Sequence, residues 1–153
     1  MWAATAEPGR DFPSLEQAVR TGTVVIGGGF TGLSTALHLA EAGRDVALLE
    51  ASTIGWGASG RNGGQVIAGL KYDPDALEAM FGPDLGPRLV RIVGDAPDYL
   101  FRLVGRLGIR CEARQAGWIQ PAHSPAALAT VEQRARQWER RGAPAVILDR
   151  KAL

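Results

Sequence analysis

The chain has 153 residues, of which 46% are hydrophobic and 22% charged, an ordinary globular composition with room for one domain and a core. The formal net charge is +1, so the basic excess of a nucleic-acid-binding protein is absent. There is no run of about 18 apolar residues and residues 1–9 lack the pattern of a secretory signal, so neither a membrane span nor export is expected. A single cysteine, Cys111, excludes an intrachain disulfide, and together these features favour the cytoplasm.

The first residues are expected to form an arm. Residues 1–22 are polar and contain prolines, which predicts an extended segment with at most one helical turn, from Ser14.

Residues 23–50 have the pattern of a strand, a glycine turn, a helix and a second strand. Residues 23–26 form a β-branched run suited to a buried strand. A helix is predicted from Phe30, because an apolar stripe follows at helical spacing: Leu33, Ala36, Leu37 and Ala40. Gly43 is expected to end this helix, and residues 46–49 form the second strand.

Three glycines in this unit have the spacing G-x-G-x-x-G. Gly27 permits a sharp turn, Gly29 lets a pyrophosphate approach the backbone, and Gly32 lets the helix pack close to the strand. The helix N-terminus would point free N–H groups at the phosphates. Glu50 follows Gly32 by 18 residues, at the tip of the second strand, where it can accept hydrogen bonds from a ribose hydroxyl. The context indicates a dinucleotide, FAD or NAD rather than NADP; the alternative is a glycine-rich turn without a ligand.

The loop at residues 51–69 is the second informative stretch. It contains six glycines, too many for a helix or a strand, and such a loop can present backbone N–H groups as an anion-binding nest. Arg61 adds a fork of donors, and Asn62 and Gln65 add amides. We expect the loop to wrap the same ligand; the alternative is a flexible loop with a surface arginine.

Two helices are predicted in residues 73–108. Residues 73–81 form a short helix with Pro74 in its first turn. A long amphipathic helix begins near Leu89, is kinked or split by Pro97 and ends at Gly108.

The remaining residues alternate between strand and helix patterns. A hairpin is predicted over residues 109–122, followed by a helix from Ser124 to Gly142 that Ser124 caps. A strand over 145–148 and the beginning of another helix at 149–153 complete the chain. No histidine or cysteine has a metal-ligand partner at useful spacing, so no metal site is expected.

Residues 24–43 followed by Glu50 resemble the N-terminal signature of the FAD-dependent amine and amino-acid oxidoreductases, the superfamily of D-amino-acid oxidase, glycine oxidase and sarcosine oxidase. The sequence of residues 54–65, Ile-Gly-Trp-Gly-Ala-Ser-Gly-Arg-Asn-Gly-Gly-Gln, is similar to the loop of the gamma-glutamylputrescine oxidoreductase branch. The resemblance extends over residues 23–153, specifically in the first half and more loosely in the second.

The resemblance implies an α/β fold in which a Rossmann-like FAD-binding βαβ unit and helices precede the beginning of a mixed or antiparallel substrate domain. The division it implies is an arm at 1–22, the N-terminal part of the FAD-binding domain at 23–108, and a truncated substrate domain at 109–153. Because relatives are much longer, we expect an N-terminal fragment, inactive and marginally stable alone, unless a second chain supplies the missing half.

The resemblance also implies a cofactor site. Its residues would be Gly27, Gly29, Phe30, Thr31, Gly32, Glu50, Ala51, Ser59, Arg61, Asn62, Gly63, Gly64 and Gln65. The glycines of the first motif would meet the pyrophosphate, Glu50 the adenosine ribose, and residues from Ser59 onward the pyrophosphate and flavin. Some relatives attach the flavin through a histidine in this loop; residues 51–69 contain none, so non-covalent FAD is expected.

The implied chemistry is oxidation of the carbon–nitrogen bond of a small amine or amino acid. Hydride passes from the carbon next to a neutral amine to the flavin, the imine is hydrolysed, and oxygen or another acceptor reoxidises the flavin. No catalytic residue is identifiable. The alternatives are an NAD-linked dehydrogenase, for which the loop at 51–69 has no evident purpose, and a non-catalytic FAD-binding remnant or subunit.

Overall fold

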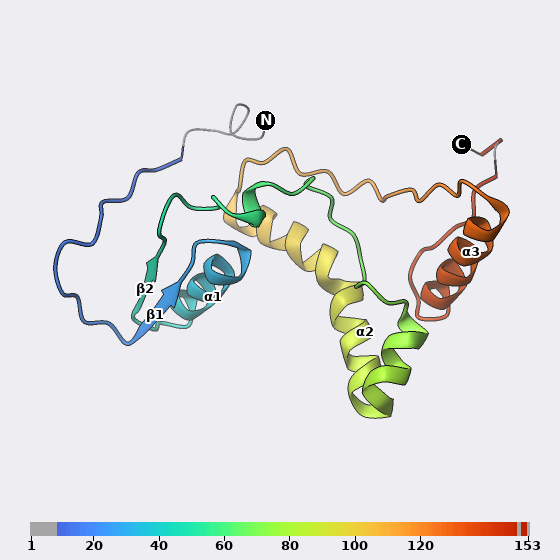
Figure 1. The fold of residues 1–153 in the computed structure, drawn as a ribbon, viewed down its shortest axis with the longest axis horizontal. Helices are drawn as coiled ribbons and strands as arrows, with labels where there is room; N and C mark the ends of the chain where they lie inside the picture. Colours follow the sequence, from blue (N-terminus) through green and yellow to red (C-terminus); the bar gives the residue numbers. More distant parts are fainter. Residues whose placement is uncertain (1–8, 150, 153) are drawn as a thin grey trace. The chain divides into compact units, whose positions relative to one another are not determined.

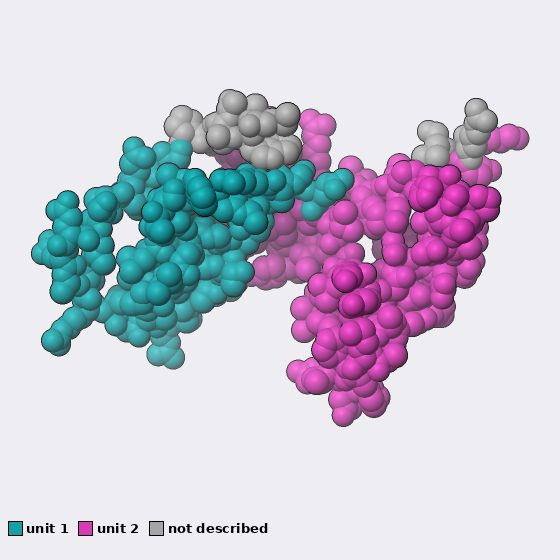
Figure 2. All heavy atoms as spheres, in the orientation of Figure 1, with its two compact units in different colours: residues 1–65 teal, residues 66–153 magenta. Residues whose placement is uncertain are grey.

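The computed structural model describes residues 9–149 and 151–152 (Figure 1). The elements in chain order are β1 (Thr23–Ile26), α1 (Phe30–Glu41), β2 (Val46–Leu49), the 3-10 helix η2 (Ala58–Gly60), α2 (Pro74–Leu107) and α3 (Pro125–Glu139). The chain divides into two compact units, residues 1–65 and 66–153, which Figure 2 colours separately. None of the described helices is long and apolar enough to cross a bilayer.

The first unit contains the predicted strand–helix–strand arrangement. β1 and β2 form a parallel pair in which Thr23 lies opposite Val46 and Ile26 opposite Leu49, and α1 makes the connection between them. The Gly27 N–H donates to the Leu49 carbonyl at 2.7 Å and continues the ladder into the turn. The β-branched run and the helical periodicity were therefore sufficient to predict this unit.

α1 ends where the sequence predicts. Gly43 has φ +71°, and its N–H donates to the Ala40 carbonyl at 2.9 Å, while the Arg44 N–H donates to the Leu39 carbonyl at 2.9 Å. This pair of bonds is a Schellman motif, which satisfies the last carbonyls of a helix and favours glycine at the left-handed position.

The faces of the two-stranded sheet are poorly covered within the first unit. The Ile26 side chain is 86% exposed and Val24 52%, and none of the residues of α1 is buried. Parallel strands usually lie in sheets covered on both faces. The first unit is therefore a mixed α/β arrangement held by backbone hydrogen bonds more than by a core.

Both helices predicted in residues 73–108 are present, joined end to end within the element α2. Its helical backbone is interrupted at Gly82, with φ 75° and ψ 178°, and not at Pro97, so the predicted split at Pro97 is wrong. Pro97 has no N–H for the Val93 carbonyl one turn earlier, and the Gly69 N–H donates to that carbonyl instead, at 3.2 Å. The helix ends at Gly108, as predicted, with φ 62°.

α3 has the predicted start. The Ser124 hydroxyl accepts the Ala127 N–H at 3.2 Å, and Pro125 occupies the first helical position. Ser124 gives one unpaired N–H group of the first turn an acceptor, and Pro125 has no N–H that would need one.

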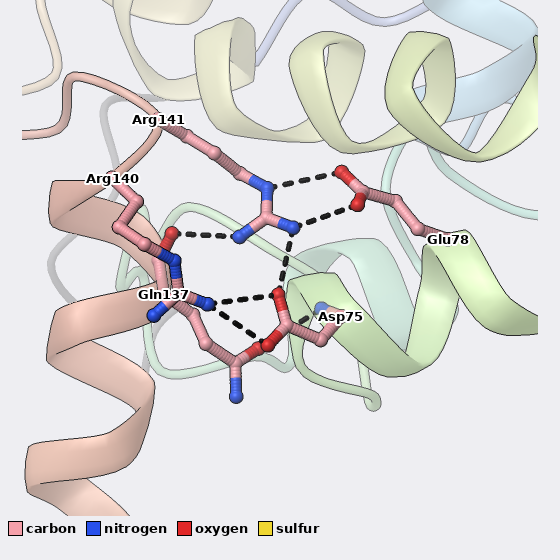
Figure 3. A network of polar contacts seen from close by, with 5 residues as sticks. All are labelled: Asp75, Glu78, Gln137, Arg140 and Arg141. Carbon is pink, nitrogen blue, oxygen red and sulfur yellow. Dashed lines mark hydrogen bonds and ion pairs between the residues drawn. The ribbon is translucent and has the colours of Figure 1, made fainter. Parts of the chain in front are cut away.

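A polar network joins the end of α3 to the start of α2 (Figure 3). The Arg141 guanidinium contacts the carboxylates of Asp75 at 2.7 Å and Glu78 at 2.8 Å, and Arg140 contacts Asp75 at 3.0 Å. Gln137, only 3% exposed, accepts the Asp75 N–H through Oε1 at 2.9 Å. The arginines lower the pKa of Asp75, and Glu78 and Asp75 raise the pKa of Arg141.

Apolar packing accompanies this network in the second unit. Leu77 and Val90 of α2 are buried, and the Trp138 ring of α3 packs against Gly69 and Gly94. A Cβ at either glycine would lie within 3.2 Å of that ring. The second unit is therefore built from helix packing, without a sheet among its described residues.

Several predicted elements are not formed. Residues 109–122 and 145–148 contain no strand, which corrects the predicted hairpin and final strand, and Ile119 and Val146 are 63% and 74% exposed. A lone hairpin is marginal in water without a packed face.

The helical structure predicted near the two ends of the chain is also not formed in the described residues. Residues 9–22 contain no helical turn at Ser14, because a helix of a few residues is unstable without packing. Residues 151–152 form a turn in which Asp149 accepts the N–H groups of Lys151 and Ala152; residues 1–8, 150 and 153 of the predicted arm and helix lie outside the described residues.

Candidate cofactor-binding site

The candidate site is built around the turn between β1 and α1. Gly27 has φ +104°, the left-handed conformation that glycine adopts without strain, which confirms the predicted sharp turn. A Cβ at Gly32 would lie 1.9 Å from the Gly27 carbonyl oxygen, so only glycine permits this close packing of helix on turn. The turn at Gly27 and the close packing at Gly32 therefore require glycine for the reasons that the sequence predicts.

Glu50 closes the turn from the end of β2. Its Oε2 accepts the Gly28 N–H at 2.7 Å, and its Oε1 accepts the Ser52 N–H at 2.9 Å. These two backbone bonds lower the pKa of Glu50, so the side chain is a carboxylate at neutral pH. A carboxylate has about four acceptor positions, which leaves capacity for a ribose hydroxyl after both bonds are made.

The glycine-rich loop docks onto the same turn. The Gly55 N–H donates to the Gly28 carbonyl at 2.9 Å, and the Ser59 hydroxyl accepts the Phe30 N–H at 3.0 Å. A Cβ at Gly29 would lie 2.9 Å from the Ser59 Oγ, so a larger residue at this position would displace the Ser59 side chain from its contact. Segments about thirty residues apart in sequence therefore meet at the start of α1.

Asn62 shapes the loop from within. Its Nδ2 donates to the Ser59 carbonyl at 2.6 Å, and its Oδ1 accepts the Gly64 N–H at 2.8 Å. Gly64 has φ +70°, and a Cβ at Gly63 would have no atom within 4 Å. The amide that the sequence assigns to a ligand is used here to fold the loop.

The other predicted residues lie in the same unit. The Thr31 carbonyl, in the first turn of α1, accepts the Thr35 hydroxyl at 2.8 Å. Ala51, at the start of the loop, and Gln65, within it, are both exposed. Sequence reasoning missed Trp56, whose ring lies 4.6 Å from the Arg61 guanidinium carbon; the signal available was an aromatic residue five positions before the arginine.

This set of groups is suited to a dinucleotide. The first N–H groups of the 12-residue α1 lack intrahelical acceptors, and the Ser59 hydroxyl and the Arg61 guanidinium add donors for phosphate oxygens. Glu50, which accepts the Gly28 N–H, offers further acceptors for ribose. The described residues contain no cluster of histidine, cysteine or carboxylate side chains able to hold a metal ion.

Comparisons with known proteins agree with this chemistry. The sequence model of the family described as "FAD dependent oxidoreductase" matches residues 23–153. Over 141 residues the chain is 41% identical to gamma-glutamylputrescine oxidoreductase of Escherichia coli (strain K12), a match that covers 92% of the chain and 33% of that protein. It is 38% identical over 96 residues to 4-methylaminobutanoate oxidase (formaldehyde-forming) of Paenarthrobacter nicotinovorans, which covers 62% of the chain and 11% of that protein.

A relative with a different named substrate also matches. Over 63 residues the chain is 46% identical to the mitochondrial L-2-hydroxyglutarate dehydrogenase of Arabidopsis thaliana, covering 40% of the chain and 13% of that protein. The chain spans a third or less of the length of these curated relatives. No solved structure matches it. The predicted resemblance is confirmed: the chain belongs to the family of FAD dependent oxidoreductases.

Proposed function

We propose that the chain is the FAD-binding portion of an oxidoreductase that oxidises a carbon–nitrogen bond of a small amine or amino acid. The observation that carries the proposal is the junction at the Gly28–Phe30 turn, where the Glu50 carboxylate and the Ser59 hydroxyl accept neighbouring backbone N–H groups. The free lone pairs of Glu50, suited to a ribose, therefore lie near the Ser59 hydroxyl, whose own hydrogen can be donated to a diphosphate. The amine class is favoured by the match over 92% of the chain to a gamma-glutamylputrescine oxidoreductase.

In this proposal each group has a specific role toward FAD. Glu50 would accept hydrogen bonds from the adenosine ribose hydroxyls through the lone pairs that its two bonds to backbone N–H groups leave free. The first turn of α1, Ser59 and Arg61 donate to the diphosphate, and the backbone of Gly63 and Gly64 extends toward the flavin. FAD supplies the hydride acceptor and is held without a covalent bond, since residues 51–69 contain no histidine.

The rest of the enzyme lies outside these residues in our proposal. We assign residues 1–22 to an arm, 23–108 to a Rossmann-like FAD-binding domain and 109–153 to the beginning of a substrate domain. The substrate-binding and catalytic groups would come from a further segment or a second chain, because the match covers only 33% of the gamma-glutamylputrescine oxidoreductase. A cytoplasmic location fits a small polar substrate and the single exposed cysteine.

The first test is the absorbance spectrum of the purified chain between about 350 and 500 nm, before and after addition of FAD and gel filtration. Two flavin bands that persist through the column are the expected result. A folded chain that retains no flavin and instead binds NAD would refute the proposal in favour of a nicotinamide-linked dehydrogenase. Turnover of an amine by the 153-residue chain alone would refute the assignment of catalytic groups to another segment.

A further inference from the structure

The Arg61 side chain contacts an aromatic ring, which does not neutralise its positive charge. The guanidinium carbon lies 4.6 Å from the centroid of the Trp56 ring, well within the range of a cation–π contact. Within the part of the chain that the structure describes, no carboxylate forms an ion pair with Arg61. Because an aromatic face orders a guanidinium without neutralising it, the positive charge remains available to an anion.

The fold of the loop brings the two side chains together. The Trp56 N–H donates to the Thr53 carbonyl at 2.9 Å, and the Arg61 N–H donates to the Ala58 carbonyl at 3.1 Å. Between them the chain closes tightly, since a Cβ at Gly60 would lie 2.2 Å from the Gly55 carbonyl oxygen. Two residues five positions apart are thus held face to face by the turn that contains η2.

The same loop is fixed to the glycine turn and to the start of α1 at two points close to the pair. Gly55, next to Trp56, donates to the Gly28 carbonyl, and Ser59, two residues before Arg61, accepts the Phe30 N–H. The pair is therefore carried on a frame that is bonded to the glycine turn through Gly55 and to the start of α1 through Ser59. A guanidinium held on this frame has a defined place relative to the helix N-terminus.

From these contacts we infer that Trp56 is a positioning residue, whose ring holds the Arg61 guanidinium ready for the diphosphate of the dinucleotide. The inference rests on the proposed function, in which Arg61 donates to that diphosphate. An arginine on a glycine-rich loop would otherwise lose its side-chain freedom on binding, and this loss opposes affinity. Trp56 reduces it by ordering the side chain beforehand.

The test is a double-mutant cycle on the full chain, with the dissociation constants of FAD and ADP measured by calorimetry. Trp56→Ala is expected to weaken binding about 2- to 5-fold, the range of an exposed cation–π contact, and Trp56→Phe to retain most of the affinity. In an Arg61→Gln background, Trp56→Ala is expected to have no further effect. An unchanged affinity for Trp56→Ala, or an equal loss in both backgrounds, would overturn the inference.

A matched control and a second readout separate this inference from the proposed function. Phe12→Ala removes another arginine–aromatic pair, Arg10 at 5.8 Å, from the arm of the same unit, and is expected to leave affinity unchanged. By NMR, the Arg61 Hε resonance should be shifted by the Trp56 ring in the wild type and in Trp56→Phe, and unshifted in Trp56→Ala. If the wild type bound neither FAD nor ADP, the proposed function would fail, and an unshifted Arg61 resonance in the wild type would overturn the ordering role itself.

Discussion

Gly32→Ala is the sharpest perturbation of the turn that carries the candidate site. The added Cβ would lie 1.9 Å from the Gly27 carbonyl oxygen and 3.1 Å from the Gly27 carbonyl carbon, so it would collide with backbone that no side-chain rotation can clear. Helix and turn would have to separate by about 1 Å, and overpacking of this kind costs about 1–3 kcal/mol. Alanine's better helix propensity, up to about 1 kcal/mol, offsets only part of this cost.

Native-state hydrogen exchange measures the effect where it occurs. Peptides from residues 23–50 should exchange faster in Gly32→Ala, by up to about 30-fold for a net loss of up to about 2 kcal/mol, while peptides from α3 keep their wild-type rates. Gly63→Ala is the matched control, because nothing lies within 4 Å of a Cβ there and its φ is not in the left-handed region. Equal protection in Gly32→Ala and wild type would refute the close packing between α1 and the turn.

Three further substitutions test the other contacts. Glu50→Gln should weaken FAD retention in equilibrium dialysis. The pKa of Glu50 lies below its ordinary value of 4.5, so the stability that the carboxylate contributes is present above pH 4.5 and is lost as the pH falls through the lower folded-state pKa. Acid should therefore increase exchange of the Gly28 amide in the wild type more than in the variant. Ser124→Ala removes the acceptor of the Ala127 N–H and should destabilise α3 by about 1 kcal/mol, measured by hydrogen exchange; unchanged exchange would contradict the cap. Gln137→Leu leaves the Asp75 N–H without its acceptor and should lower the free energy of urea unfolding by about 1–3 kcal/mol; an unchanged midpoint would contradict that bond.

Local signals account for the parts of the fold that could be predicted. The turn at Gly27, the end of α1 at Gly43 and the start of α3 at Ser124 each depend on a few neighbouring residues, and each is formed as predicted. Such features follow from backbone preference and capping, which short sequence windows contain. The Gly-x-Gly-x-x-Gly spacing is the clearest case, because Gly32 must be glycine to lie so close to the carbonyl of Gly27, the first glycine of the motif.

Long-range contacts account for the rest. The bond from Gly69 to the Val93 carbonyl exists because Pro97 leaves that carbonyl free, and no local pattern connects a loop glycine to a helix carbonyl 24 residues later. Residues with strand patterns, such as Ile119 and Val146, remain exposed because β structure needs partner strands to pair with. Periodicity identifies residues suited to a strand and contains no information about whether a partner is present.

The candidate site and the stability of the first unit are coupled by the same contacts. Glu50 and the loop hold the turn through a few hydrogen bonds, two of them accepted by Glu50 and Ser59, while Ile26 remains exposed on the neighbouring strand. A unit with so little buried apolar surface gains proportionately more from a ligand that bridges the turn, the helix start and the loop. If the proposed cofactor binds only the folded unit, FAD at 100 times its dissociation constant should stabilise it by about 2.7 kcal/mol. Cofactor binding would then be part of how this unit folds, and FAD-dependent protection of residues 23–65 against exchange should accompany flavin retention.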